Sequence, residues 1–376
     1  MKKEDNKLKP ALHGGDIVSA SEQYGIAQDK WIDLSTGLNP DSYPIKDVPA
    51  SAYSHLPYLQ PDFLHASTQY YASDQGMGLI GSQMIIQALP KCVDKYPVLL
   101  PSAGYTEHRA HWLKHQFDVV SYDGFESELA SGQITAALKA NAQQHLVIIN
   151  PNNPTGMMLD VDKIMQWSTM LAEGCYIVVD EAFIDTQPNQ SLLKQLWPQN
   201  VLVLRSFGKF FGLAGIRIGF AFCTGELRAK IEQVLGLWMI NGPAQYIATQ
   251  AMLDSDWQQQ AIEKIDSAAL KTQQLFAPLI KYVNESDSAA KAHWQTHQAL
   301  FSSYKMCREH ALNIQEFFAQ QGILIRVIEL SELIERAEKT GDEKPVALLR
   351  VGILGLNNSE DQQRVKACVE AYIANA

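Results

Sequence analysis

The stretch SFGKFFGLAGIRIGF, residues 206–220, holds four glycines, four phenylalanines and only two charged side chains, Lys209 and Arg217. Removing an ammonium group from water is costly unless another group compensates it. Such a lysine is either a surface residue whose stem lies on apolar neighbours or an amine that burial keeps reactive. The residues on either side of the stretch distinguish the two interpretations.

Short runs rich in Val and Ile alternate with helical segments from about residue 75 to 255. We expect strands at 97–100, 118–122, 145–150, 176–183, 201–207 and 216–222, and helices at 161–173 and 226–237. Near-continuous apolar strands that alternate with helices are typical of a mostly parallel sheet covered on both faces. The sequence therefore predicts an α/β fold, with a large domain built on a mostly parallel sheet between helices.

The pattern changes towards the carboxyl end. We expect a polar loop at 284–298, a long helix at 299–320, strands at 323–330 and 346–353, and a closing helix at 359–373. These elements predict a smaller α+β domain. We assign residues 46–260 to the large domain, and residues 1–45 with 261–376 to the small one.

The composition excludes several classes of protein. A net charge of -10 without a long basic run argues against nucleic-acid binding. No apolar run approaches the roughly 20 residues that cross a bilayer, and the charged start MKKEDNKLKP does not resemble a signal peptide. The five cysteines show no C-x-x-C spacing, so we expect neither a disulfide framework nor a zinc site, and a cytoplasmic location.

Residues 76–81, GMGLIG, match the G-x-G-x-x-G pattern of dinucleotide sites. The match is weak because a poor strand candidate precedes the glycines and no acidic residue follows at the required distance. The glycines with Ser82 instead predict an anion cradle at a helix start, or a plain turn.

Three histidines in EHRAHWLKH, His108, His111 and His115, share one helical face. Such a face can bind a metal ion, but no acidic or thiolate partner is evident nearby. We expect no metal site and interpret these histidines as a solvated helix face.

Three motifs carry the chemistry. NPNNPTG (150–156) follows a strand, DEAF (180–183) sets a carboxylate at a strand end, and Lys209 follows a third strand. Each alone also fits a turn, a capped helix or a surface lysine. Together they suit an anionic aromatic aldehyde, which needs a lysine for a Schiff base, donors for its phosphate and a carboxylate for its ring nitrogen. The cofactor predicted is pyridoxal 5′-phosphate.

The catalytic residues would be Lys209, Asp180 and Tyr105. Lys209 forms the Schiff base and returns a proton to the substrate Cα, Asp180 keeps the ring nitrogen protonated, and Tyr105 stacks on the ring. Asn153 would donate to the ring hydroxyl oxygen. The cofactor phosphate would be surrounded by Ser82, Ser206 and Arg217, and Gly81 and Gln83 would also bind the cofactor.

The order of these motifs resembles the fold-type I, aspartate-aminotransferase-like family over nearly the whole chain. Within that family the sequence is most similar to the L-threonine-O-3-phosphate decarboxylases of cobalamin biosynthesis, more than to the histidinol-phosphate aminotransferases. The stretches that carry this likeness are HGG (13–15), WIDLSTGLNP (31–40), YTEHRAHW (105–112), VVDEAFID (178–185) and LRSFGKFFGLAGIRIGF (204–220).

The resemblance implies a homodimer that decarboxylates L-threonine O-3-phosphate to (R)-1-amino-2-propanol phosphate. It implies Arg350 as the clamp for the substrate carboxylate, through a bidentate guanidinium. The remaining substrate contacts that it implies are His13, Gly14, Gly15, Gly37, Leu38 and Asn153.

The sequence departs from the family pattern at three positions. Phe183 replaces a tyrosine that bonds the ring hydroxyl in many aminotransferases, and Gly208 replaces the serine before the lysine. Leu56 stands where a tyrosine usually reaches the partner subunit, which leaves Tyr53 or Tyr58 for that contact.

Two other functions remain open at this point. An aminotransferase acting on histidinol phosphate, with 2-oxoglutarate as partner, differs only in which Cα bond stands perpendicular to the cofactor ring, and residue spacing does not reveal that. A cofactor-binding module without catalysis is disfavoured because Lys209, Asp180 and Arg350 each suit a catalytic role.

Overall fold

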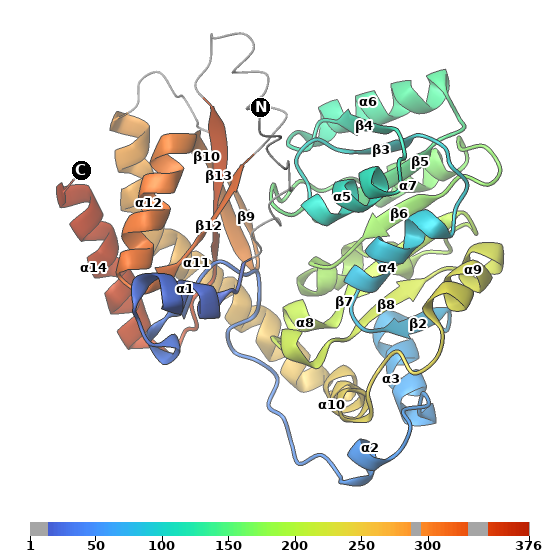
Figure 1. The fold of residues 1–376 in the computed structure, drawn as a ribbon, viewed down its shortest axis with the longest axis horizontal. Helices are drawn as coiled ribbons and strands as arrows, with labels where there is room; N and C mark the ends of the chain where they lie inside the picture. Colours follow the sequence, from blue (N-terminus) through green and yellow to red (C-terminus); the bar gives the residue numbers. More distant parts are fainter. Residues whose placement is uncertain (1–13, 287–294, 330–344, 376) are drawn as a thin grey trace, which may run out of the picture.

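The computed structural model describes residues 14–286, 295–329 and 345–375. Two sheets organise two parts of the chain that lie side by side (Figure 1). Within the described ranges, no helix is both long and apolar enough to cross a membrane.

The larger part is built on a seven-stranded sheet. Across the sheet the strands are β2 (Gly76–Leu79), β8 (Gly219–Phe222), β7 (Val201–Ser206), β6 (Ile177–Asp180), β5 (His145–Ile149), β3 (Val98–Pro101) and β4 (Val119–Tyr122). The strands from β7 to β4 pair in parallel, and β8 runs antiparallel to both of its neighbours. The predicted α/β fold with a mostly parallel sheet is confirmed.

Helices cover both faces of this sheet, as its apolar strands require. Alternate residues of one strand enter different cores: Val147 packs with α4 (Gln83–Ala88), α5 (Thr106–Lys114) and α9 (Gly225–Leu235), whereas Ile148 packs with α6 (Ser127–Ala140), α7 (Val161–Ser168) and α10 (Gly242–Leu253). The carboxyl ends of the strands meet at one edge of the sheet, where ligands bind in such sheets.

The smaller part holds a four-stranded antiparallel sheet in the order β12 (Arg326–Glu329), β13 (Val346–Gly352), β10 (Phe301–Cys307) and β9 (Gln295–Gln298). Its core lies between this sheet and the helices α11 (Ser255–Ser286), α12 (Arg308–Gln320) and α14 (Ser359–Asn375). A two-stranded pair, β1 (Ile32–Asp33) with β11 (Ile323–Leu324), and helix α1 (Ile17–Tyr24) join the amino-terminal segment to it.

Two predictions about the secondary structure are wrong. Residues 299–300 form a turn and residues 301–307 form strand β10 instead of the first half of a helix, because β10 lies between β9 and β13 and no glycine or proline marks the start of α12. In the predicted loop 284–298, residues 284–286 continue α11 and 295–298 form β9. Residues 76–79 of the glycine-rich stretch form β2, antiparallel to β8, and Gly81 with Ser82 follows it before helix α4.

The amino-terminal segment also reaches the lysine stretch. The backbone N–H of Asn39 donates to the carbonyl of Lys209 at 3.0 Å, and its side chain donates to the carbonyl of Phe210. Helices α2 (Ser51–Ser54) and α3 (Pro61–Tyr71) follow this segment in the chain, and both contact α10. The buried residues in the first half of α11 belong to the core of the larger part, and those in its second half belong to the core of the smaller part. The division of the chain into domains at residues 46 and 260 stays a prediction.

Candidate active site

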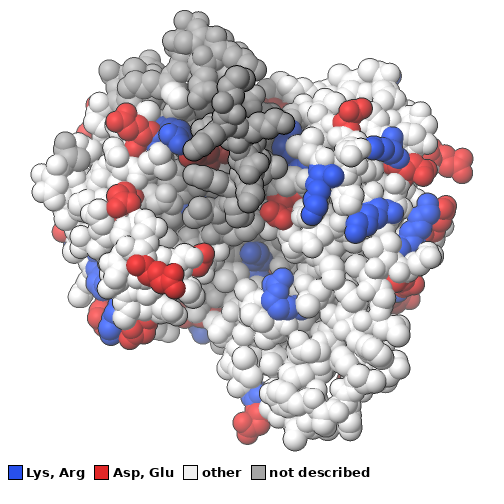
Figure 2. Space-filling view, in the orientation of Figure 1, with Lys and Arg blue, Asp and Glu red and all other residues white. Residues whose placement is uncertain are grey.

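A cavity of about 210 Å³ lies at the carboxyl ends of β5, β6 and β7, next to strands β12 and β13 of the smaller sheet. On the face drawn in Figure 2, basic side chains are visible in the hollow where the two parts meet. Most residues predicted for the site line this cavity: Gly14, Gly37, Gly81, Ser82, Gln83, Tyr105, Asn153, Asp180, Ser206, Lys209, Arg217 and Arg350.

Three predicted residues are not among those that line the cavity. His13 lies outside the described residues. Gly15 has a φ of 88° and donates its N–H to the Ser35 hydroxyl at 2.7 Å, so it forms a turn beside the cavity. Leu38 is partly buried next to Gly37 and is absent from the described lining.

Lys209 lies in the short helix α8 (Phe207–Phe210), directly after β7. Burial, together with the nearby Arg350, lowers the pKa of Lys209 to about 8. Its Nζ lies 5.4 Å from the centre of the Phe183 ring, which gives the ammonium form a weak cation–π contact. An amine with this pKa is partly unprotonated at neutral pH, which a nucleophile requires.

Asp180 ends strand β6 and is 3% exposed. Its Oδ2 lies 2.9 Å from Nε2 of His108, which is equally buried, and its Oδ1 accepts the N–H of Ala182 at 3.1 Å. The interpretation of His108 as part of a solvated helix face is therefore wrong. His108 is instead buried in contact with the Asp180 carboxylate. Within the described ranges, no cluster of His, Cys, Asp and Glu could hold a metal ion.

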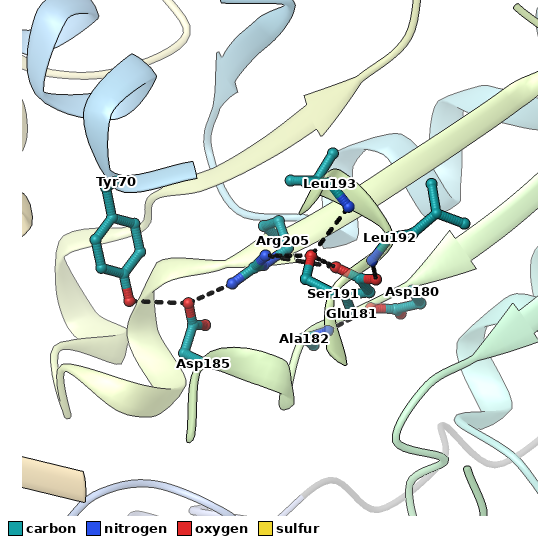
Figure 3. Close-up of polar contacts among 9 residues, drawn as sticks. All are labelled: Tyr70, Asp180, Glu181, Ala182, Asp185, Ser191, Leu192, Leu193 and Arg205. Atoms are coloured by element: carbon teal, nitrogen blue, oxygen red, sulfur yellow. Dashed lines mark hydrogen bonds and ion pairs between the residues drawn. The ribbon is translucent and has the colours of Figure 1, made fainter. Parts of the chain in front are cut away.

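A buried ionic network fixes the strand ends next to Asp180 (Figure 3). Arg205, next to Ser206 at the end of β7, contacts Asp185 and lies 3.4 Å from the Glu181 carboxylate. Glu181 also accepts the N–H of Leu192 at 2.7 Å. Because an unpaired buried charge is costly, these contacts hold β6 and β7 in one arrangement.

Arg217 enters the cavity from a strained backbone. Its φ is 59°, in the left-handed region, and its Nη1 donates to the carbonyl of Ala214 at 3.1 Å. Gly81 is needed opposite it, since a Cβ at Gly81 would lie 2.8 Å from Nη2 of Arg217. The hydroxyl-bearing residues Ser82 and Ser206 line the same cavity and make no capping hydrogen bonds to their own helices. The group suits an anion such as phosphate.

Gly208, which replaces the expected serine, has a steric reason. A Cβ at this position would lie 2.7 Å from the Cα of Ala214. The backbone before Lys209 therefore packs directly on the segment that leads to Arg217, and a serine here would push the two apart.

Arg350 projects from β13 and is 3% exposed. It donates through Nη1 to Oδ1 of Asn153 at 2.7 Å and through Nη2 to the carbonyl of Ser35, while its Nε has no hydrogen-bond partner within the described residues. Burial and the nearby Arg326 lower the pKa of Arg350 to about 9. A guanidinium held by these two neutral acceptors can bind an anionic ligand.

Arg326 is the cavity residue that the sequence interpretation missed. It stands in β12 inside the otherwise apolar run ILIRVI, as Arg350 stands inside VALLRVG. A single charge in an apolar strand is the signal that would have identified it. Among the residues that the structure describes, four cationic side chains line the cavity, Arg326 included, against one carboxylate, Asp180.

The three asparagines of residues 150–153 have different surroundings. Asn150 exchanges hydrogen bonds with Leu159, and Asn152 donates to the carbonyls of Ala103 and Gly124. Asn153 alone of the three lines the cavity.

The chain is similar to several characterised proteins. A family model described as aminotransferase class I and II matches residues 52–337. The threonine-phosphate decarboxylase of Pseudomonas aeruginosa is 30% identical over 344 residues, 91% of this chain and 97% of the relative. That of Sinorhizobium sp. is 35% identical over 254 residues, 66% of this chain and 73% of the relative.

The fold is also that of solved structures. The crystal structure of histidinol-phosphate aminotransferase from Sinorhizobium meliloti in complex with pyridoxal-5′-phosphate matches with a TM-score of 0.71 and 18% identity, covering 99% of both chains.

Proposed function

The chain belongs to the aminotransferase class I and II family, and we propose that it decarboxylates L-threonine O-3-phosphate to (R)-1-amino-2-propanol phosphate, in the formation of the aminopropanol arm of cobalamin. It is a pyridoxal-phosphate-dependent enzyme. The observation that carries the proposal is the cavity itself, in which, among the described residues, three arginines and one carboxylate lie around Lys209. A bound cofactor phosphate and a substrate with two anionic groups would balance those charges.

The residues present fit pyridoxal 5′-phosphate. Gly81 and Arg217 form a close cradle that a Cβ would fill, and Asp180 is a buried carboxylate at the strand end. We assign Arg217, Ser82 and Ser206 to the cofactor phosphate, Asp180 to the ring nitrogen and Tyr105 to the ring face. When bound, the cofactor supplies a ring that accepts the electrons of a breaking bond at the substrate Cα.

Lys209 has two tasks in this proposal. Its lowered pKa leaves an unprotonated amine that can bond covalently to the cofactor aldehyde. With cofactor and substrate bound, Nζ of Lys209 would be the group that returns a proton to the substrate Cα. Phe183 packs beside Nζ and restricts where the lysine can turn.

We assign the carboxylate and the phosphate of the substrate to two different arginines. Arg350, oriented by Asn153 and Ser35, is assigned to the carboxylate. Arg326 lies beside it and is assigned to the substrate phosphate. Decarboxylation needs the carboxylate held out of the cofactor plane, and a second anchor at the phosphate fixes that rotation.

An aminotransferase acting on histidinol phosphate is the alternative, and it would use the same cations. Two relatives that share 30% and 35% identity with this chain are decarboxylases, which favours the first function. Incubating the purified protein with L-threonine O-3-phosphate, cofactor and the amino acceptor 2-oxoglutarate tests it, because mass spectrometry separates the amine product of decarboxylation from the 2-oxo acid and glutamate that transamination would form.

We also propose a cytoplasmic homodimer. The five cysteines are buried and unpaired, as a reducing compartment favours. Large apolar side chains are exposed together around α2 and the α9–α10 loop, and an apolar patch on a folded protein suits a protein partner. They are Tyr53, Leu56, Tyr58, Leu237 and Trp238. Sedimentation equilibrium at micromolar concentration tests the dimer, which a purely monomeric protein would refute.

A further inference from the structure

Helix α5 begins with a carboxylate, Glu107, to which the proposed chemistry gives no role. Its Oε2 accepts a hydrogen bond from Nε2 of Gln83 at 2.6 Å, and Oε1 of Gln83 accepts the hydroxyl of Tyr105 at 3.0 Å. His111, one turn further along α5, places Nε2 at 3.3 Å from the same Glu107 oxygen. A series of hydrogen bonds thus links His111 and Glu107 to Gln83 and Tyr105, and the last two residues line the cavity.

Glu107 sets the direction of these hydrogen bonds. A carboxylate only accepts, so Gln83 must turn its NH₂ towards Glu107 and its carbonyl oxygen towards Tyr105. The Tyr105 hydroxyl is then a donor to Gln83. If Glu107 were removed, the Gln83 amide could turn over and offer its NH₂ to the hydroxyl, which would reverse that bond.

Burial preserves the direction of the hydrogen bonds among Glu107, Gln83 and Tyr105. The Glu107 side chain is 16% exposed and the His111 side chain is 15% exposed, so solvent competes little for the carboxylate. Burial, followed by the nearby Glu107, raises the pKa of Tyr105 to about 12. The hydroxyl therefore keeps its proton, and its role as donor, at neutral pH.

We propose that Glu107 is a positioning residue, which fixes the Gln83 amide and through it the tilt of the Tyr105 ring that stacks on the cofactor. The proposal rests on the assignment of this cavity to pyridoxal 5′-phosphate. It also explains why the first turn of α5 carries a largely buried carboxylate.

A double-mutant cycle on the apoprotein tests the proposal. The affinity for pyridoxal 5′-phosphate is measured by fluorescence quenching for the wild type, Glu107→Ala, Tyr105→Phe and the double variant. Glu107→Ala is expected to weaken binding roughly fivefold in the wild-type background, a size typical of coupled contacts, and less than twofold in the Tyr105→Phe background. Glu107→Gln, which keeps one acceptor oxygen, is expected to give an intermediate loss.

The control is Glu128→Ala, which removes an exposed carboxylate from the first turn of the neighbouring helix α6 and should leave the affinity unchanged. Equal losses from Glu107→Ala in both backgrounds, or no loss in either, would overturn the positioning role alone. Failure of the wild-type protein to bind pyridoxal 5′-phosphate would overturn the cofactor assignment and this inference together.

Discussion

Arg326 and Arg350 face each other as Cα partners on adjacent antiparallel strands, β12 and β13, and both line the cavity. Burial lowers the pKa of both guanidinium groups, and in Arg350 the proximity of Arg326 adds to the effect. Two like charges placed this way repel each other. Binding of anions would relieve the repulsion, which supports our proposal that this pair holds the two negative groups of the substrate.

Replacing each of the two arginines should change kcat/KM differently for phosphorylated and unphosphorylated substrates. Arg350→Ala is expected to lower kcat/KM roughly 100-fold for L-threonine O-3-phosphate and for unphosphorylated L-threonine alike, because both carry the carboxylate. Arg326→Ala should lower it by a similar factor for the phosphorylated substrate and less than threefold for L-threonine. Steady-state kinetics on both substrates measure this, and equal losses in Arg326→Ala would refute the assignment of Arg326 to phosphate.

Lys209 should destabilise the apoprotein in a pH-dependent way. Its pKa is about 8 in the folded chain, below the 10.5 of a free lysine, so the penalty for its buried charge is complete below pH 8 and disappears as the pH rises to 10.5. Lys209→Met should therefore raise the free energy of unfolding by about 2 kcal/mol at pH 7, a value reduced for partial exposure to the cavity. Urea unfolding at pH 7 and pH 10 measures it, and a gain that grows with pH would contradict this account.

His108 should act through Asp180. Asp180→Asn is expected to lower kcat on the order of 100-fold, and His108→Leu roughly tenfold because the buried carboxylate loses a hydrogen-bond donor. If His108 works by holding Asp180, the double variant should be no slower than Asp180→Asn. His115→Leu, on the same helix, serves as the control, and losses that multiply in the double variant would show an independent role for His108.

Gly208 should be sterically required. Gly208→Ser places a Cβ against the backbone of Ala214 and is expected to lower the free energy of unfolding by about 1–3 kcal/mol. Gly215→Ser is the matched control, since nothing lies within 4 Å of a Cβ at Gly215. Urea unfolding compares the two, and equal effects would mean that the close approach of residues 208 and 214 is not limiting.

The sequence predicted the parallel sheet and most of the cavity because both depend on local patterns. Apolar strands end in Asp180 and Ser206, and parallel strands bring those ends to one edge of the sheet. The role of His108 was missed because its partner is 72 residues away, a relation that helical spacing does not contain. Arg326 was missed for a related reason: it joins the site only when β12 pairs with β13, in a sheet whose strand β10 was predicted as part of a helix.

The most direct test of the central claim is release of CO₂ from L-threonine O-3-phosphate labelled in its carboxyl group, with 2-oxoglutarate present. Decarboxylation predicts one labelled CO₂ per aminopropanol phosphate formed, no glutamate, and no activity in Lys209→Ala. Formation of glutamate without labelled CO₂ would contradict the claim and identify the protein as an aminotransferase.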